Sequence, residues 1–322
     1  MERMLFIKVF LISSYRYLEN KDIIMLNMEL HLQAFTSDSL KSKLHELCDF
    51  EPKYYDFPGS IPVSLSRNDV KYLHKNYCVC DKTDGSRYMC LCTNNQIYFV
   101  DRLMNFYYFG SNEIDDNDYV YDGELVKNKV NDKYVFVIFD VFASGGKVLK
   151  SIPNHYKRIQ NVIGLLPQVI QNVEFRMKSF FFTFNLKKCL NQNLPYETDG
   201  LIFTPMYRKI FNGTDKRTYK WKDGVNHTID FEVVNNYIYL WDKNNEKIKI
   251  CKVEEETFID YSVTPCIVEC KIGILNEETI WTIIKQRKDK ARPNSMKTYL
   301  STIEVIKENI TIDYLNNNLC IN

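Results

Sequence analysis

A lysine stands between two short runs of alternating apolar residues, in the stretch CVCDKTDGSRYMC at residues 78–90. The alternation predicts two strands, so Lys82 through Arg87 are predicted to form the turn that joins them. A lysine amine is a nucleophile only when it is neutral, which requires neighbouring cations or burial to lower its pKa from about 10.4. A charged turn is most often solvated and inert, so Lys82 becomes a candidate only together with other residues of the chain.

Further charged or aromatic residues recur where strands are predicted to end. They are Glu124 in YDGELV, Phe139 and Asp140 in YVFVIFDVFASGG, Asp199 at the start of DGLIFTP, and Lys220 and Lys222 in YKWK. The two lysines are two residues apart, so they share one face of their strand. Each residue is unremarkable by itself, and their order along the chain is the more specific signal.

The composition bounds the classes of protein to consider. The 322 residues include 42 Lys and Arg against 41 Asp and Glu, a formal charge of +1. This balance does not predict a broad basic surface for nucleic acid, so any recognition of phosphate is expected to be local. The length allows one large or two moderate domains with apolar cores. The 22 Tyr and 20 Phe favour strand-rich structure.

The cysteines indicate free thiols, and the apolar runs are too short to indicate a membrane span. Ten cysteines are irregularly spaced in a long chain without a convincing secretory signal, which predicts free thiols. Cys78 with Cys80, and Cys90 with Cys92, form two C-x-C pairs for which a zinc site is the alternative to simple burial on one strand face. The run LFIKVFLISS is short and interrupted by Lys8, and no later run reaches membrane-spanning length, so no membrane partner is expected.

The hydrophobic patterns predict an α+β protein in which strands dominate. Helical spacing extends over 29–48, with Ser37 and Ser39 as caps, and over 154–171. Short aromatic and β-branched runs separated by polar turns predict an antiparallel sheet rather than repeated βαβ units. These runs are 77–81, 87–92, 97–101, 119–126, 134–142, 179–184, 199–204 and 217–222.

A change of pattern after Lys222 predicts a second domain. Residues 223–226 have turn composition, and the strand-like runs that follow are joined by tight turns, which predicts a small β-barrel. A helix is expected from Lys297. The predicted domains are therefore 1–224 and 225–322, the second including the C-terminal helix.

The motifs resemble, in order, those of the covalent nucleotidyltransferases, which comprise nucleic-acid ligases and mRNA capping guanylyltransferases. FPGSIPVSLSR at 57–67 and RKDKARPN at 287–294 look like segments of the monofunctional, fungal-type capping enzymes, and the resemblance covers about 57–300. It implies a ligase-type, ATP-grasp-like nucleotidyltransferase domain with antiparallel sheets, followed by an OB-fold β-barrel that closes over GTP. Lys285 departs from the pattern, because the family usually has a second arginine there.

The resemblance also implies a reaction and a role for each matching residue. The expected enzyme is an mRNA guanylyltransferase, which attaches GMP from GTP to Lys82 and passes it to the 5′-diphosphate end of RNA, with Mg²⁺ or Mn²⁺. The implied nucleotide contacts are Arg87 to ribose or the RNA end, Glu124 to ribose or metal, Phe139 stacked on guanine, Lys178 to guanine O6, and Asp199 to the metal. The implied phosphate contacts are Lys220 and Lys222 to the α-phosphate, and Arg287, Asp289 and Lys290 to the leaving pyrophosphate.

Two other classes of protein remain open. An ATP-dependent RNA or DNA ligase would use the same lysine, whereas a non-catalytic binding module is expected to lack one of the central charged residues, and none is missing. For a cellular protein the resemblance implies two partners, an RNA triphosphatase and the phosphorylated C-terminal tail of RNA polymerase II, and a nuclear location. A viral protein would act in the cytoplasm or the virion.

Overall fold

The chain forms two compact units. The larger unit consists of Gln33–Asn226 with Ile303–Asn322, and the smaller unit is His227–Thr302. The run LFIKVFLISS and Asp289 lie outside the residues that the structure describes. No helix in the described part of the chain is long and apolar enough to cross a membrane. The structure is a computed structural model that describes residues 32–52, 56–74, 76–111, 115–160, 169–223, 227–253, 256, 259–275, 278–288 and 290–320.

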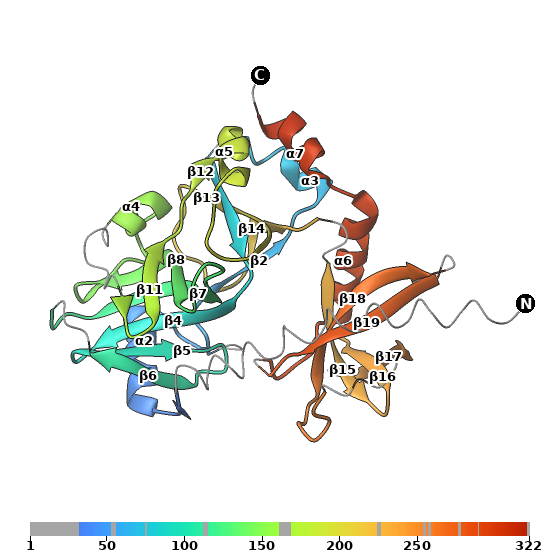
Figure 1. The fold of residues 1–322 in the computed structure, drawn as a ribbon, viewed down its shortest axis with the longest axis horizontal. Helices are drawn as coiled ribbons and strands as arrows, with labels where there is room; N and C mark the ends of the chain where they lie inside the picture. The colour runs from blue at the N-terminus through green and yellow to red at the C-terminus, as the bar shows by residue number, and fades with distance from the viewer. Residues whose placement is uncertain are drawn as a thin grey trace, which may run out of the picture. The chain divides into compact units, whose positions relative to one another are not determined.

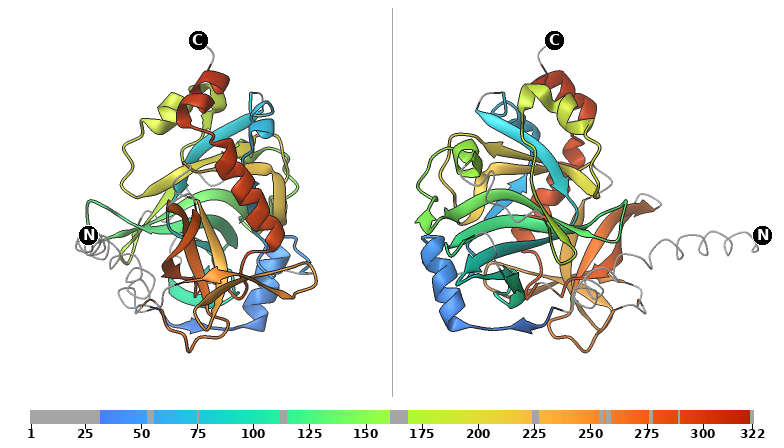
Figure 2. Two further views of the ribbon diagram at one scale, coloured as in Figure 1. Left: turned by 90° about the vertical axis from the view of Figure 1, so that its right-hand side faces the viewer. Right: turned by 60° about the vertical axis from the view of Figure 1, so that its left-hand side comes forward.

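A nine-stranded sheet forms one layer of the larger unit, in the order β1-β6-β5-β4-β7-β8-β11-β10 with β9 paired to β8 (Figure 1). All its pairings are antiparallel except that of β8 with β11. Helix α2 (Asp38–Leu47) lies against this sheet, where Leu44 and Leu47 join its apolar core (Figure 2). The strands are β1 (Ala34–Phe35), β4 (Ser86–Thr93), β5 (Gln96–Val100), β6 (Phe106–Ser111), β7 (Tyr119–Lys127), β8 (Tyr134–Ser144), β9 (Lys147–Val148), β10 (Val169–Ile170) and β11 (Val173–Met177).

A five-stranded sheet forms the second layer of the larger unit, in the order β12-β3-β13-β14-β2. The pairing of β14 with β2 is parallel, so each sheet of the larger unit is antiparallel, as predicted, apart from one parallel pair. The strands are β2 (Ser60–Ser64), β3 (Tyr77–Thr83), β12 (Phe181–Phe182), β13 (Thr198–Pro205) and β14 (Gly213–Trp221). The short helices are α3 (Arg67–Val70), α4 (His155–Gln160), η1 (Thr183–Asn185) and α5 (Leu186–Leu190).

The smaller unit contains a five-stranded antiparallel sheet in the order β17-β16-β15-β18-β19. Among the described residues, β17 and β19 do not pair with each other, so the sheet is not closed into the predicted barrel. An OB-fold is a partly open five-stranded barrel, and the number of strands agrees with that prediction. The strands are β15 (Thr228–Val234), β16 (Tyr237–Trp241), β17 (Lys247–Lys252), β18 (Ile267–Leu275) and β19 (Glu278–Gln286).

The C-terminal helices return the chain to the larger unit. Helix α6 (Met296–Glu308) leads into α7 (Ile312–Leu319), which lies beside α5 (Figure 1). Leu315 and Leu319 are buried in one apolar cluster with Leu201 of β13. The sequence groups this C-terminal segment with the second domain, whereas its packing places residues from Ile303 onward in the larger unit.

Truncation of Leu315 should destabilise the larger unit strongly, because the side chain is 0% exposed. We expect Leu315→Ala to lower the free energy of unfolding by about 2–5 kcal/mol, through lost burial and the cavity left behind. Asn317→Ala, on the exposed side of the same helix, should change it by less than about 0.5 kcal/mol. Urea unfolding of the two variants measures both values, and equal values would contradict the observed packing of α7.

Seven of the eight strands predicted in the larger unit lie near their predicted positions, whereas β1, β2, β6, β9, β10 and β11 were not predicted. Lys82 and Arg87 lie in β3 and β4 rather than in the turn, because pairing continues to Thr83 and resumes at Ser86. The helix predicted over 29–48 begins only at Asp38, where Ser37 caps it, and residues 34–35 form β1 instead.

Two other predicted elements are shorter than expected. The helix predicted over 154–171 ends at Gln160 in α4, residues 161–168 are not described, and residues 169–170 form β10. The strand predicted over 179–184 is reduced to two residues, followed by the turn η1.

The ten cysteines are all free thiols. The two C-x-C pairs lie in different sheets, because β3 belongs to the five-stranded sheet and β4 to the nine-stranded one. Their four thiols are buried. The alternation of these cysteines therefore reflects packing on strand faces.

Candidate active site

The Asp199 carboxylate on β13 lies between two lysines. Lys82 is on β3, which pairs with one side of β13, and Lys222 directly follows β14, which pairs with the other side. Lys82 Nζ lies 2.5 Å from Asp199 Oδ1, and Lys222 Nζ lies 2.5 Å from Asp199 Oδ2. The three side chains are each about four-fifths buried, with 17–20% of their surface exposed. The structure therefore brings together three of the residues predicted for phosphate chemistry.

The electrostatic balance at Asp199 favours its charged form. Burial alone would raise the pKa of this carboxyl group, but the charges of Lys82 and Lys222 outweigh burial and hold the pKa below its usual value. Asp199 is therefore a fixed negative charge at neutral pH, and it holds the ends of both lysine side chains near one point.

Strand register explains why these groups share a face. Cys80 pairs with Ile202 of β13, and Ile202 pairs with Lys220 of β14. Because side chains alternate along a strand, Lys82 and Lys220 point to the same side of the five-stranded sheet. Lys220 is half-buried there.

The opposite face of β14 is anchored by Trp221, which stands between Lys220 and Lys222. Its indole N–H donates a hydrogen bond to the Ile310 carbonyl over 2.8 Å, and the ring packs in the cluster that contains Leu315. The C-terminal segment therefore packs against β14 and stabilises it. This strand carries Lys220 and ends at Trp221, directly before Lys222.

Arg87 is held by Asp122, a residue for which the sequence suggested no role. The Arg87 Nε and Nη2 groups donate to the two Asp122 carboxylate oxygens over 2.9 and 2.6 Å, and Nη1 donates to the Ser60 carbonyl over 2.6 Å. The sequence did contain a signal, because Asp122 and Glu124 are two residues apart in YDGELV and share a strand face. These three hydrogen bonds use three of the five N–H groups of Arg87, so the predicted contact with ribose or RNA would have to use the other two.

Two aromatic rings pack against this guanidinium group, and one of them, Phe57, comes from the segment FPGS. The Phe57 ring centroid lies 5.4 Å from Arg87 Cζ, and the Phe139 ring centroid lies 5.3 Å from it. A Cβ atom on Gly59 would lie 2.5 Å from both Arg87 Nη2 and Phe57 Cε1, so a larger residue would have to displace these side chains. The motif thus has a physical basis in the close packing of its backbone against Arg87.

Glu124 lies opposite Arg87 in the pairing of β4 with β7. Its carboxylate makes no hydrogen bond within the described part of the chain. Burial raises the pKa of Glu124, and the nearby charge of Lys82 lowers it by less, so the pKa stays above its usual value. A cation or a hydroxyl donor at this position would stabilise the carboxylate.

The carboxylates near Lys82 could bind a divalent cation whose remaining ligands come from the substrate and from water. No group of three His, Cys, Asp or Glu side chains suited to a metal occurs among the described residues. Mg²⁺ commonly binds through one or two carboxylates together with substrate phosphates and water. Asp199 and Glu124, which both interact with Lys82, match that donor set.

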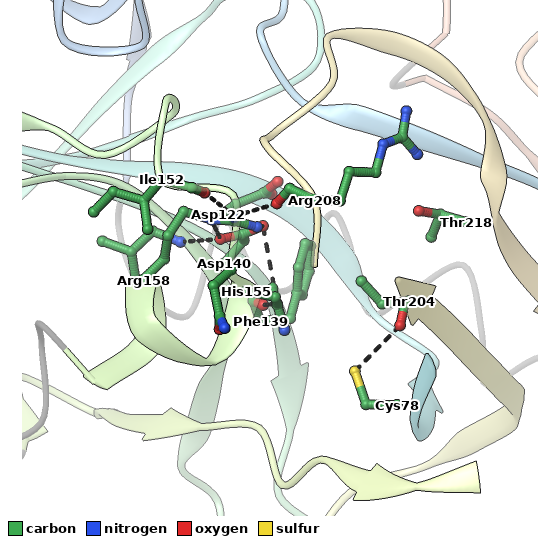
Figure 3. Close-up of polar contacts among 12 residues, drawn as sticks. Cys78, Asp122, Phe139, Asp140, Ile152, His155, Arg158, Thr204, Arg208 and Thr218 are labelled. Atoms are coloured by element: carbon green, nitrogen blue, oxygen red, sulfur yellow. Dashed lines mark hydrogen bonds and ion pairs between the residues drawn. The ribbon is translucent and has the colours of Figure 1, made fainter. Parts of the chain in front are cut away.

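The backbone of Phe139 is held by a histidine on α4 (Figure 3). The His155 Nε2–H group donates to the Phe139 carbonyl over 2.8 Å, and the ring packs edge-on against Phe180 at 4.5 Å between centroids. Burial lowers the pKa of His155 by more than the Asp140 carboxylate raises it, so the imidazole is neutral. Phe139 itself is only partly buried, and its ring faces Arg87.

A buried ion pair fixes the next residue of β8. Arg158 Nε and Nη2 donate to the two Asp140 carboxylate oxygens, each over 2.8 Å, and Arg158 Nη1 donates to the carbonyls of Ile152 and Arg208 (Figure 3). Burial would raise the pKa of Asp140, but the Arg158 charge prevails and lowers it. The sequence contained only part of this signal, since Asp140 was visible at a strand end but its partner was not.

Lys178 lies in a buried polar cluster with Asp81. Its ammonium group contacts the Asp81 carbonyl at 2.9 Å, Asp81 Oδ2 at 3.0 Å and the Thr83 hydroxyl. These contacts occupy its three N–H groups, so a bond to guanine O6 would replace one of them. Asp81 Oδ1 has no hydrogen-bond partner within the described residues. No pattern in the sequence indicated that Asp81 would bind Lys178.

The predicted pyrophosphate ligands belong to the smaller unit. Arg287 Nη1 lies 3.1 Å from Asp230 Oδ1 and 3.4 Å from Glu269 Oε2, and Lys290 also pairs with Asp230. Lys285, the departure from the expected arginine, lies 3.4 Å from Glu269. These basic side chains are therefore gathered around two carboxylates of β15 and β18.

Family models match both parts of the chain. The model described as "mRNA capping enzyme, catalytic domain" matches residues 28–224, and the model described as "mRNA capping enzyme, C-terminal domain" matches residues 206–316. Together they extend over both compact units.

Individual relatives of this chain are also named as mRNA-capping enzymes. The "mRNA-capping enzyme subunit alpha" of Schizosaccharomyces pombe is 27% identical over 337 residues, which is 84% of this chain and 81% of the relative. The "mRNA-capping enzyme" of Caenorhabditis elegans is 25% identical over 86% of this chain and 50% of the relative. Among solved structures, a mycobacterial DNA ligase D complexed with ATP has a TM-score of 0.44 at 11% identity, over 74% of this chain and 97% of the ligase.

Proposed function

Because the chain belongs to the mRNA capping enzyme family, we propose that it is an mRNA guanylyltransferase and that Lys82 is its nucleophile. The observation that carries the assignment of Lys82 is its place beside Asp199, which also binds Lys222. Attack on phosphate requires the neutral amine, so Lys82 must give up its proton and leave this ion pair when it reacts, which the nearby cations would favour. GTP and RNA are the substrates.

In the first step, the neutral Lys82 amine attacks the α-phosphorus of GTP. A P–N bond forms, the bond between the α-phosphorus and the oxygen that bridges to the β-phosphate breaks, pyrophosphate leaves with that electron pair, and one amine proton is released to solvent. Lys220 and Lys222 would neutralise the charge that develops on the α-phosphate. Asp199, charged at neutral pH, would hold Lys82 and Lys222 in place before the nucleotide arrives.

In the second step, the terminal phosphate oxygen of diphosphate-ended RNA attacks the GMP phosphorus. The P–N bond breaks, Lys82 is regenerated, and the product carries the GpppN cap. We propose that Asp199 and Glu124 hold Mg²⁺ or Mn²⁺, which when bound adds positive charge at the phosphates. We assign Arg87 to the ribose or the RNA end.

Transfer of label from nucleotide to protein tests this function. Protein incubated with α-labelled GTP and Mg²⁺ or Mn²⁺ should become labelled, and α-labelled ATP should label it far less. Labelling by ATP instead of GTP would indicate a ligase, the alternative left open by the sequence. Labelling by neither nucleotide would contradict the function.

For the base, we propose that guanine stacks on Phe139 and that Lys178 contacts its O6 atom. Phe139→Leu should weaken GTP binding in the labelling reaction by about 0.5–1.5 kcal/mol, roughly 2- to 13-fold, because a stacking contact is lost. Phe57→Leu is the matched control, since Phe57 also packs on Arg87 but is assigned no contact with guanine. Equal losses in the two variants would show that Phe139 acts through Arg87.

The partners of the reaction follow from its chemistry. RNA transcripts begin with a triphosphate, so an RNA triphosphatase must supply the diphosphate end, and we propose such an enzyme as a partner. We also propose that the phosphorylated tail of RNA polymerase II recruits the protein and that it acts in the nucleus. Copurification of the protein with phosphorylated but not unphosphorylated tail peptide would support the recruitment.

A further inference from the structure

An edge strand extends the face of the five-stranded sheet that carries Lys82. Phe182 of β12 pairs with Cys78 of β3. Cys78 and Lys82 are four residues apart on one strand, so Phe182 and Lys82 point to the same side of the sheet. The distance along β3 between these positions is about 13 Å at about 3.3 Å per residue.

Two aromatic rings are stacked at this edge and remain open to solvent. The rings of Phe182 and Phe184 are 5.2 Å apart between centroids and nearly parallel, with 7° between their planes. Phe182 is 49% exposed and Phe184 is 47% exposed. A pair of exposed, parallel rings is a platform on which another flat group can stack.

Positive charge adjoins the two rings along the chain. Lys187 and Lys188 follow in α5, and both are exposed. Neither makes an ion pair with any described residue. Exposed rings beside unpaired cations match the chemistry of single-stranded nucleic acid, in which bases stack and phosphates carry the negative charge.

We propose that Phe182 and Phe184, with Lys187 and Lys188, bind the first nucleotides of the RNA acceptor as a single strand. This inference rests on the proposed function, because it requires the RNA 5′ end to react at Lys82. About 13 Å corresponds to about four stacked nucleotides at about 3.4 Å each. Because Cys78 and Cys80 are buried on the face between the two positions, the RNA must run along the edge of the sheet at β12 for bases near its 5′ end to reach the rings.

The test compares two acceptors that differ only in having an RNA chain. A 20-nucleotide RNA with a 5′-diphosphate is one acceptor, and GDP is the other, because its terminal phosphate can attack the enzyme-bound GMP to give GpppG. Pre-formed enzyme–GMP adduct is mixed with each acceptor and followed in a single turnover. The double variant Phe182→Ala/Phe184→Ala should need about 10-fold more RNA for half-maximal rate, with unchanged use of GDP.

Three further variants sharpen the test. Tyr108→Ala removes a ring of the same exposure, 47%, from β6 in the other sheet and should leave both acceptors unaffected. Phe182→Tyr keeps a ring that can stack, so this variant should use RNA as well as the wild type does. Lys187→Ala/Lys188→Ala should weaken use of RNA and reduce its dependence on salt.

Several outcomes would overturn the proposal without touching the proposed function. If the double phenylalanine variant used RNA as well as the wild type, but bound a doubly phosphorylated serine peptide more weakly, the surface would be a protein-docking site. If the variant lost RNA and GDP equally, the rings would act on the adduct rather than on RNA. Failure of the wild type to form any adduct would instead contradict the proposed function itself.

Discussion

Lys82→Ala should leave no detectable GMP on the protein, a loss of more than about 10³-fold in adduct formation. The wild type should form an adduct that is labile in acid and stable in alkali, as expected for a P–N bond. The reason is chemical, because the reaction needs an amine at the α-phosphate, and Lys82 lies in the cluster with Asp199 and Lys222. Denaturing gels after incubation with α-labelled GTP measure the adduct.

Two further variants separate the nucleophile from its charge. Lys82→Arg keeps a cation beside Asp199, but a guanidinium group stays protonated in proteins and cannot attack, so this variant should also form no adduct. Lys216→Ala removes an exposed lysine from β14 of the same sheet and should label normally. Wild-type labelling of Lys82→Ala would show that another residue is the nucleophile.

Strand alternation made part of the site predictable from the sequence. It places Cys78, Cys80 and Lys82 on one face of β3, and Lys220 and Lys222 on one face near the end of β14. The contact of Lys82 with Asp199 joins residues 117 positions apart, and no local pattern contains it. Only the order of the motifs suggested that these residues meet.

The partners of Arg87 and Lys178 could not be predicted, because they depend on strand register. Asp122 lies diagonally across from Arg87 in the pairing of β4 with β7, where Arg87 stands opposite Glu124. The alternation shows that Asp122 and Glu124 share a face, but the register that brings them to Arg87 is set by packing across the whole sheet. The same holds for Asp81, which is one residue from the nucleophile but points to the other face and binds Lys178.

The position of the C-terminal helix shows a different limit. Its amphipathic pattern predicts an apolar face but not the surface that the face will cover, because the hydrophobic effect has no direction. Leu315 and Leu319 therefore indicate burial without indicating that their neighbours are Leu201 and Trp221. The strand predictions were more accurate because the alternation of side chains is local to each strand.

The cations of the smaller unit should matter for one step of the reaction and not for the other. Arg287 and Lys290 both pair with Asp230, and we propose that they leave these ion pairs to hold the β- and γ-phosphates of GTP, with Asp289 orienting them. Those phosphates depart as pyrophosphate at the end of the first step. Once GMP is on Lys82, the two basic side chains have no phosphate left to stabilise.

Arg287→Ala and Lys290→Ala should therefore each slow formation of the enzyme–GMP adduct by about 10²–10³-fold, because a preorganised cation on a transferring phosphate is worth several kcal/mol. The guanylylated fraction of each variant is isolated, mixed with diphosphate-ended RNA and followed in a single turnover, where its rate should match the wild type. Lys288→Ala, an exposed neighbour, should leave both steps unchanged. If the RNA step were slowed as much as the first, these side chains would not act on the leaving pyrophosphate, even with Lys82 established as the nucleophile.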